Sequence, residues 1–117
     1  MSGESSLPTV LDLLSDEYAR AILSATSEEP MSAKDLSERC DASLPTVYRR
    51  IDQLTDADLL DERTQLRRDG NHHRVYTATL HRFALELEDG EFTADLERRD
   101  GGSEDVADRF TRMWEGL

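Results

Sequence analysis

Apolar residues recur every three or four positions in the first half of the chain and alternate with polar residues in much of the second half. The first spacing places side chains on one face of a helix, whereas alternation is typical of a strand with one buried face. The first half therefore predicts a short helix over residues 7–14 with an apolar stripe of Leu7, Val10, Leu11 and Leu14. It is followed by helices over residues 16–26, 32–39 and 43–54. The second half predicts two β-hairpins and a final helix over residues 103–117.

Capping residues mark where these helices begin. Asp16 is placed to cap the second helix, and Ser32 with Asp35 resembles a capping box in which Asp replaces Glu. Ser43 can cap the fourth helix by accepting a hydrogen bond from an unpaired backbone N–H. Pro45 lies in the first turn of that helix, where its missing N–H costs nothing.

The helix over residues 43–54 has a narrow apolar stripe formed by Val47, Ile51 and Leu54. Its opposite face carries Thr46, Arg49 and Gln53, with Arg50 at the edge. A helix of about two turns, a tight turn at residues 40–42 and this second helix have helix-turn-helix geometry. A short helix with an arginine on its outer face suits the major groove of DNA, and an ordinary amphipathic surface helix is the alternative.

Both hairpins are predicted from turn signals between alternating runs. Residues 63–68 and 73–79 can pair around residues 69–72, and a hairpin directly after a recognition helix is the layout of a winged helix. In the second hairpin, Asp89-Gly90 joins two alternating apolar runs, Phe83, Leu85, Leu87 and Phe92, Ala94, Leu96. Residues 81–88 also tolerate a helix, but the turn signal favours strands.

The chain has 117 residues, which fits one domain with a modest core. We expect an α+β fold: a winged helix-turn-helix over residues 1–80, an additional β-hairpin over residues 81–98 and a C-terminal dimerisation helix over residues 103–117. No apolar run is long enough to span a membrane, and the N-terminus lacks a signal-peptide pattern. The single cysteine, Cys40, excludes an internal disulfide and fits a cytoplasmic protein.

The net charge of −12 would by itself argue against a nucleic-acid partner. However, only one of the 14 basic residues is a lysine, and the acidic residues are spread along the whole chain. This pattern is typical of proteins from organisms with molar intracellular salt, where charges are screened beyond about 3 Å. We therefore expect salt cations at the acidic surface and give more weight to local charge. Residues 63–74 carry four arginines and two histidines against one acid.

The candidate DNA-binding residues lie on the recognition helix and the wing. Arg49 is a candidate for a bidentate contact to guanine and Arg50 for a phosphate contact, while Tyr48 is expected to lie half in the core with its hydroxyl reaching a phosphate. The wing arginines suit phosphate or minor-groove contacts, the alternative being a solvated hairpin edge. The full set is Ser43, Thr46, Tyr48, Arg49, Arg50, Gln53, Arg67, Arg68, His72, His73 and Arg74.

Other chemistry has less support in the sequence. Cys40 could be a redox switch, but without a second cysteine a small buried residue is the better interpretation. His72 and His73 are adjacent on a strand and point to opposite faces, so they do not readily share a metal ion. The chain has no phosphate-binding glycine loop and no nucleophile motif. We therefore expect no catalysis, no metal and no cofactor.

The last predicted helix is unusually apolar for a terminal element. Such a helix could fold back on its own domain, but in a chain this small we expect it to pair with its copy in a homodimer. The residues of this face are Val106, Phe110, Met113, Trp114 and Leu117.

The segments 15–23, 32–36 and 43–54, followed by residues 58–60, resemble the winged helix-turn-helix regulators of haloarchaea in the broad ArsR/PadR-like group. The resemblance covers about residues 10–80. It implies a dimeric transcriptional regulator that reads a palindrome-like operator in double-stranded DNA. The cysteine pair of metal-sensing ArsR members is absent here. A protein-interaction module that keeps the winged fold without sequence-specific DNA binding is the alternative class.

Overall fold

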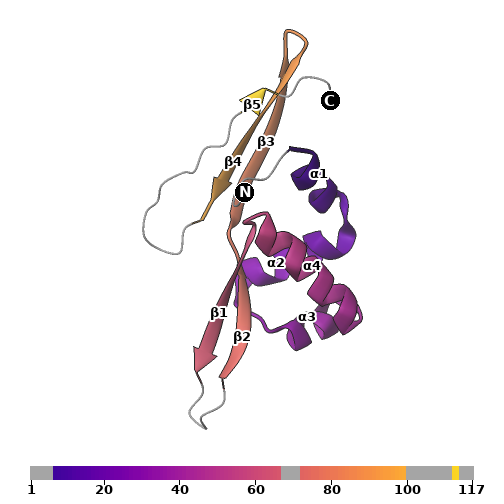
Figure 1. Ribbon diagram of the computed structural model, residues 1–117, viewed down its shortest axis with the longest axis vertical. Helices are drawn as coiled ribbons and strands as arrows, with labels where there is room; N and C mark the ends of the chain where they lie inside the picture. The colour runs from indigo at the N-terminus through magenta and orange to yellow at the C-terminus, as the bar shows by residue number, and fades with distance from the viewer. Residues whose placement is uncertain (1–6, 67–71, 100–111, 114–117) are drawn as a thin grey trace. The chain divides into compact units, whose positions relative to one another are not determined.

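The computed structural model describes residues 7–66, 72–99 and 112–113 (Figure 1). The chain divides into two compact units, Met1–Ala78 and Thr79–Leu117.

The first unit is built from four helices and a β-hairpin (Figure 1). Helix α2 packs against α1, α3, α4 and the second strand of the hairpin, so it is the central element of this unit. The core includes the fully buried side chains of Ile22, Leu36, Leu54 and Leu59. The elements are α1 (Leu7–Ser15), α2 (Glu17–Glu28), α3 (Ala33–Cys40), α4 (Leu44–Asp56), β1 (Leu60–Leu66) and β2 (His72–Ala78).

The predicted caps of α2 and α3 are confirmed. The Asp16 carboxylate accepts a hydrogen bond of 2.8 Å from the backbone N–H of Ala19. At α3, Ser32 and Asp35 form the reciprocal capping box, with the Asp35 N–H donating to Ser32 Oγ at 3.1 Å. These caps satisfy N–H groups that have no partner within their helices.

The tight turn between α3 and α4 is confirmed as well. Asp41 ends α3 in the left-handed conformation, with φ of 55°. The N–H of Ala42 then donates to the carbonyl of Ser37 at 3.1 Å, and the Ser37 hydroxyl donates to the carbonyl of Ala42 at 2.6 Å. The turn is therefore held from both directions, which fixes the approach of α4 to α3.

Helix α4 ends in a left-handed residue, a stop that the sequence analysis did not anticipate. Asp58 has φ of 62°, the N–H of Leu59 donates to the carbonyl of Leu54 at 2.9 Å, and the Asp58 N–H donates to the carbonyl of Thr55 at 3.0 Å. This pair of bonds is a Schellman motif, which satisfies the last helical carbonyls and turns the chain. The turn leads directly from α4 into the hairpin.

Strands β1 and β2 are antiparallel, with Leu60 opposite Ala78 and Leu66 opposite His72. β1 begins at Leu60, and its pairing with β2 starts there as well, three residues before Arg63, where the predicted pairing begins. Leu59 and Leu60 are buried and continue the core beyond the helix. On the other side of β2, Met31 forms a bridge with Tyr76 through N–H···O bonds of 3.1 and 2.8 Å. The loop between α2 and α3 is thus attached to the two-stranded wing by a single bridge.

One detail of the helices differs from the prediction. In α1 the buried residues are Leu7, Val10 and Leu13, whereas Leu11 and Leu14 are only half-buried. The predicted stripe was therefore displaced by one position at its C-terminal end, an ambiguity that a run of adjacent leucines leaves open. Tyr48 is 50% exposed, which agrees with its expected place half in the core.

The second unit contains β3 (Leu80–Glu88), β4 (Glu91–Arg98) and the short β5 (Arg112–Met113), in the order β3-β4-β5. Strand β3 confirms the prediction of a hairpin and excludes a helix over residues 81–88. Its turn has Asp89 at φ of 55° and Gly90 at φ of 82°. Positive φ at both central residues is the type I′ geometry that Asp-Gly favours, because its twist matches that of the flanking strands.

The predicted helix over residues 103–117 is wrong at the two residues of that segment that the structure describes. Arg112 and Met113 form β5 and pair with Ala94 and Thr93 of β4. The edge of β4 offers unpaired backbone groups, and pairing with them competes with helix formation for a short segment. The other residues assigned to the dimerisation face, Val106, Phe110, Trp114 and Leu117, lie outside the described residues.

Candidate nucleic-acid interface

Helix α4 has the two faces that its sequence predicted. Val47, Ile51 and Leu54 are buried, at 1, 2 and 0% exposure, and anchor the helix to the core. On the other side Arg49 and Gln53 are exposed, and Thr46 is half-buried. The helix therefore presents an outer face of polar side chains that can donate to and accept from base edges.

The start of α4 is organised by Ser43. Its Oγ accepts from the backbone N–H of Thr46 at 3.4 Å and donates to the hydroxyl of Thr46 at 3.0 Å. Pro45 occupies the first turn, as predicted. The N-terminal turn, the part of a recognition helix that approaches bases in helix-turn-helix proteins, is thus held in a defined geometry.

Arg49 and Arg50 are neighbours in sequence but have different surroundings. Arg49 is exposed and forms no ion pair with any of the described residues. Arg50 donates from Nε to Asp16 Oδ2 at 2.8 Å and from Nη2 to Asp16 Oδ1 at 3.1 Å. The fork of this guanidinium is occupied within the protein, so a phosphate at Arg50 would have to compete with Asp16.

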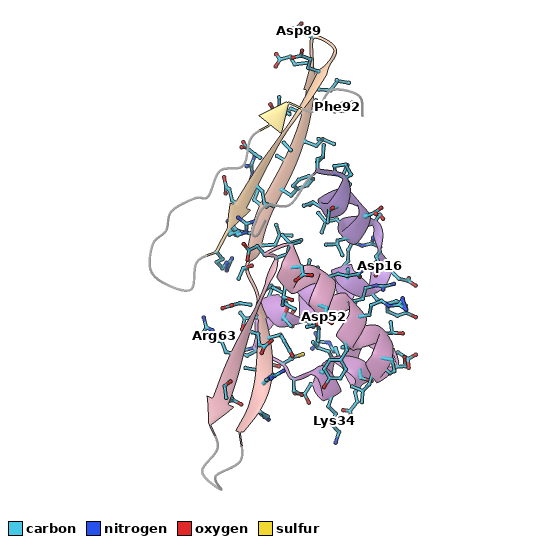
Figure 2. All side chains as sticks on the ribbon, in the orientation of Figure 1. Asp16, Lys34, Asp52, Arg63, Asp89 and Phe92 are labelled. Carbon is cyan, nitrogen blue, oxygen red and sulfur yellow. The ribbon has the colours of Figure 1, made fainter. Side chains whose placement is uncertain are left out.

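The Asp16–Arg50 pair joins the start of α2 to the middle of α4. The side chains of Arg50 and Asp16 are only 21% and 27% exposed. The hydrogen bond from Arg50, more than any other interaction, lowers the pKa of Asp16, and the same bond raises the pKa of Arg50. Because Asp16 also caps α2, one carboxylate, labelled in Figure 2, links the start of α2 to α4.

The described part of the wing carries basic side chains that already have partners. Arg74 pairs with Glu62 at 3.3 Å and Arg63 with Asp61 at 3.5 Å, all four being well exposed. His73 Nε2 lies 2.8 Å from Gln65 Oε1. Ion pairs this exposed are weak, so a phosphate can replace the carboxylate at little cost. His72 lies in β2, and Arg67 and Arg68 fall outside the described residues.

A groove of about 660 Å³ runs between α3, α4 and β2. Its lining includes Lys34, Tyr48, Arg74 and Tyr76, together with the carboxylates of Asp35 and Glu38. Lys34 is exposed near the start of α3 and points away from the helices (Figure 2). Burial raises the pKa of Tyr76. Lys34 and Tyr76 are not among the predicted site residues, because they come together only when the wing folds beside the helices.

Cys40 is half-buried at the end of α3, and burial raises the pKa of its thiol. A raised pKa reduces the thiolate fraction, the form that reacts with oxidants. This position therefore favours a packing role over a redox switch. Among the residues with described side chains, no three His, Cys, Asp or Glu residues come together as a metal-binding group. None of the described helices has the length and apolar character needed to cross a membrane.

Residues 14–63 match the model of a family described as a helix-turn-helix domain. The matched range contains α2, α3 and α4 and reaches into β1, the part of the chain that positions the outer face of α4. The comparison with curated proteins found no match. The family match and the geometry of α3, its tight turn and α4 together support a DNA-binding transcriptional regulator of the helix-turn-helix type.

Proposed function

We propose that this protein is a sequence-specific transcriptional regulator that binds double-stranded DNA as a homodimer, with α4 in the major groove. The observation that supports this most directly is Arg49, an exposed arginine without an ion pair among the described residues, on the outer face of a helix anchored by three buried side chains. A guanidinium in this position can reach O6 and N7 of guanine with two hydrogen bonds. The role is one of binding, with no catalytic step.

The wing contributes contacts that hold the protein in register. Arg74 and, beyond the described part of the hairpin, Arg67 and Arg68 are proposed to contact phosphates or the minor groove. Such contacts carry little sequence information but contribute much of the affinity. Recognition helices in the two copies of a dimer, about 34 Å apart, would read the two halves of a palindrome-like operator.

Acidic side chains flank the proposed DNA-binding surface. Asp52 and Asp56 are exposed on α4, Asp41 is exposed just before it, and Glu62 is exposed on β1. We propose that salt cations lie between these carboxylates and the phosphates when DNA binds, which adapts the protein to high salt. Cation uptake at the acids would offset the cations that DNA releases.

The test is selection of binding sequences from a random DNA library, followed by fluorescence anisotropy on the selected and scrambled duplexes. The proposal expects an enriched palindrome-like sequence and a clear preference for it. Arg49→Ala should reduce the preference, whereas the exposed Arg20→Ala on α2, a matched loss of one arginine, should leave it unchanged. A protein that enriches no sequence and binds both duplexes equally would refute sequence-specific recognition.

A further inference from the structure

Strand β3 is an edge strand in the part of the chain that the structure describes. The sheet order is β3-β4-β5, so β4 has neighbours on both sides and β3 on only one. Edge strands present unpaired backbone groups, and natural proteins usually shorten, charge or cover them. β3 has nine residues and no proline, and its register shift lies near its start, between Leu80 and Arg82, which leaves a regular edge from Arg82 to Glu88.

The backbone groups at the free edge belong to the apolar positions of β3. Glu88 and Glu91 flank the Asp89-Gly90 turn, where the turn hydrogen bond joins the first and fourth residues. Along an antiparallel strand, successive residues direct their backbone N–H and C=O groups alternately toward the neighbouring strand and away from it. From Arg82 to Glu88, where the register is regular, the even-numbered positions of β3 therefore face β4, and the free edge is formed by Phe83, Leu85 and Leu87.

The same three residues form an apolar face together with their partners on β4. Phe83 lies opposite Leu96, Leu85 opposite Ala94, and Leu87 opposite Phe92. Ala94 and Leu96 are buried, but Leu85 is 41% and Leu87 is 61% exposed. The apolar surface is thus least covered toward the turn, next to the free backbone edge.

We propose that β3 pairs antiparallel with β3 of a second copy of this chain, across a two-fold axis at Ala84. This proposal deepens the homodimer of the proposed function and rests on it. The pairing centred on Ala84 joins the regular stretch 82–86 of both copies, from Arg82 opposite Glu86 to Glu86 opposite Arg82, and ends before the register shift between Leu80 and Arg82. It places the outward-facing backbone groups of Phe83 opposite those of Leu85 in the other copy, as an antiparallel hydrogen-bonded pair requires.

Charge complementarity identifies a second copy as the occupant. In this register Arg82 of each copy lies opposite Glu86 of the other, in pairs without backbone hydrogen bonds, where side chains come closest. Both side chains are exposed, and among the described residues Arg82 forms an exposed ion pair of 3.3 Å with Glu97 on β4. The isologous pairing therefore makes two opposite-charge contacts and joins the two apolar faces into one.

Disulfide trapping tests the register directly. In a Cys40→Ser background, which leaves no other thiol, Ala84→Cys should form a crosslinked dimer on mild oxidation. Its Cα atoms would lie about 4.5 Å apart, within the range of a disulfide. Glu86→Cys is the matched control: its two copies would be offset by four residues, about 13 Å along the strand, and should not crosslink.

Charge exchange tests the contacts, in about 0.15 M salt so that screening is incomplete. Glu86→Arg and Arg82→Glu should each weaken dimerisation on the order of tenfold or more, because each places like charges opposite one another twice. Mixing the two variants should restore the dimer, since both contacts in the mixed dimer again join opposite charges. Sedimentation velocity measures the assembly, and circular dichroism checks that each variant stays folded.

A monomeric wild-type chain, a dimer that Ala84→Cys does not crosslink, or variants that do not complement each other would each overturn the proposal. A dimer that is lost when residues 103–117 are removed but is indifferent to Glu86→Arg would assign the contact to the C-terminal segment instead. The DNA titration is independent of these readouts. A crosslinked dimer that does not bind DNA would refute the proposed function and support the β3 interface. A protein that binds DNA but does not crosslink would support the proposed function and refute the β3 interface.

Discussion

Removing the carboxylate of Asp16 should destabilise the fold more than an ordinary surface substitution, because this group has two roles. It caps α2 through the N–H of Ala19 and holds the guanidinium of Arg50 on α4 with two hydrogen bonds. The variant Asp16→Ala removes both interactions. Asp16→Asn keeps a good capping residue and removes only the charge, so the two variants separate the roles.

The magnitude follows from the burial and geometry of the pair. Loss of a cap costs about 1 kcal/mol. Exposed ion pairs contribute ~0.2–1 kcal/mol, whereas breaking a buried pair costs ~3–5 kcal/mol. With both side chains about three-quarters buried and two hydrogen bonds formed, we expect an intermediate ~1–2 kcal/mol for the pair. Asp16→Ala should then lower the free energy of unfolding by ~2–3 kcal/mol and Asp16→Asn by ~1–2 kcal/mol.

The stability should also depend on pH through this pair. Because the pKa of Asp16 is lowered in the folded protein, its ionised form is favoured by folding. The resulting stabilisation is present above the unfolded pKa of about 3.9 and is lost as pH falls through the folded pKa. The wild-type protein should therefore lose more stability than Asp16→Asn as the pH is lowered below about 4.

Urea denaturation followed by circular dichroism measures both effects. A double-mutant cycle with Asp16→Asn and Arg50→Gln isolates the coupling between the two side chains. We expect a coupling free energy of about 1 kcal/mol or more at neutral pH. A value below ~0.3 kcal/mol, or equal acid sensitivity of the wild-type and Asp16→Asn proteins, would refute the reasoning.

Three further predictions concern DNA. Arg49→Ala should weaken specific binding by ~1–3 kcal/mol and relax the preference at one base position. Competition with scrambled DNA measures this preference, and an unchanged preference in the variant would contradict the role of Arg49. Arg67→Ala or Arg68→Ala should weaken binding to all sequences about equally, which anisotropy on specific and random duplexes can compare. The logarithm of the binding constant should fall with the logarithm of the salt concentration less steeply than the slope of about −0.9 for each arginine–phosphate contact. Calorimetry up to molar potassium chloride measures this slope. Replacing Asp41, Asp61 and Glu62 by neutral amides should make that slope more negative. An unchanged slope would exclude a role for these three carboxylates.

The local features of this protein could be predicted from its sequence because they depend on residues within a few positions of one another. The capping box of Ser32 and Asp35, the cap at Ser43 and the Asp89-Gly90 turn all satisfy backbone groups close by in the chain. The buried stripe of α4 is equally local, since helical geometry alone places its three residues on one side. These features determined the order of the elements and the outer face of the recognition helix.

Tertiary structure decided which charged side chains are engaged and where distant segments pair. Arg49 and Arg50 are indistinguishable as residue types, but folding brings Asp16 to Arg50, 34 positions away, and leaves Arg49 exposed. Likewise, Met31 pairs with Tyr76, and Arg112 with Ala94, only because the chain returns to those strands. Periodicity reports which face of an element is buried, whereas the partner across a long loop is set by the packing of the whole unit.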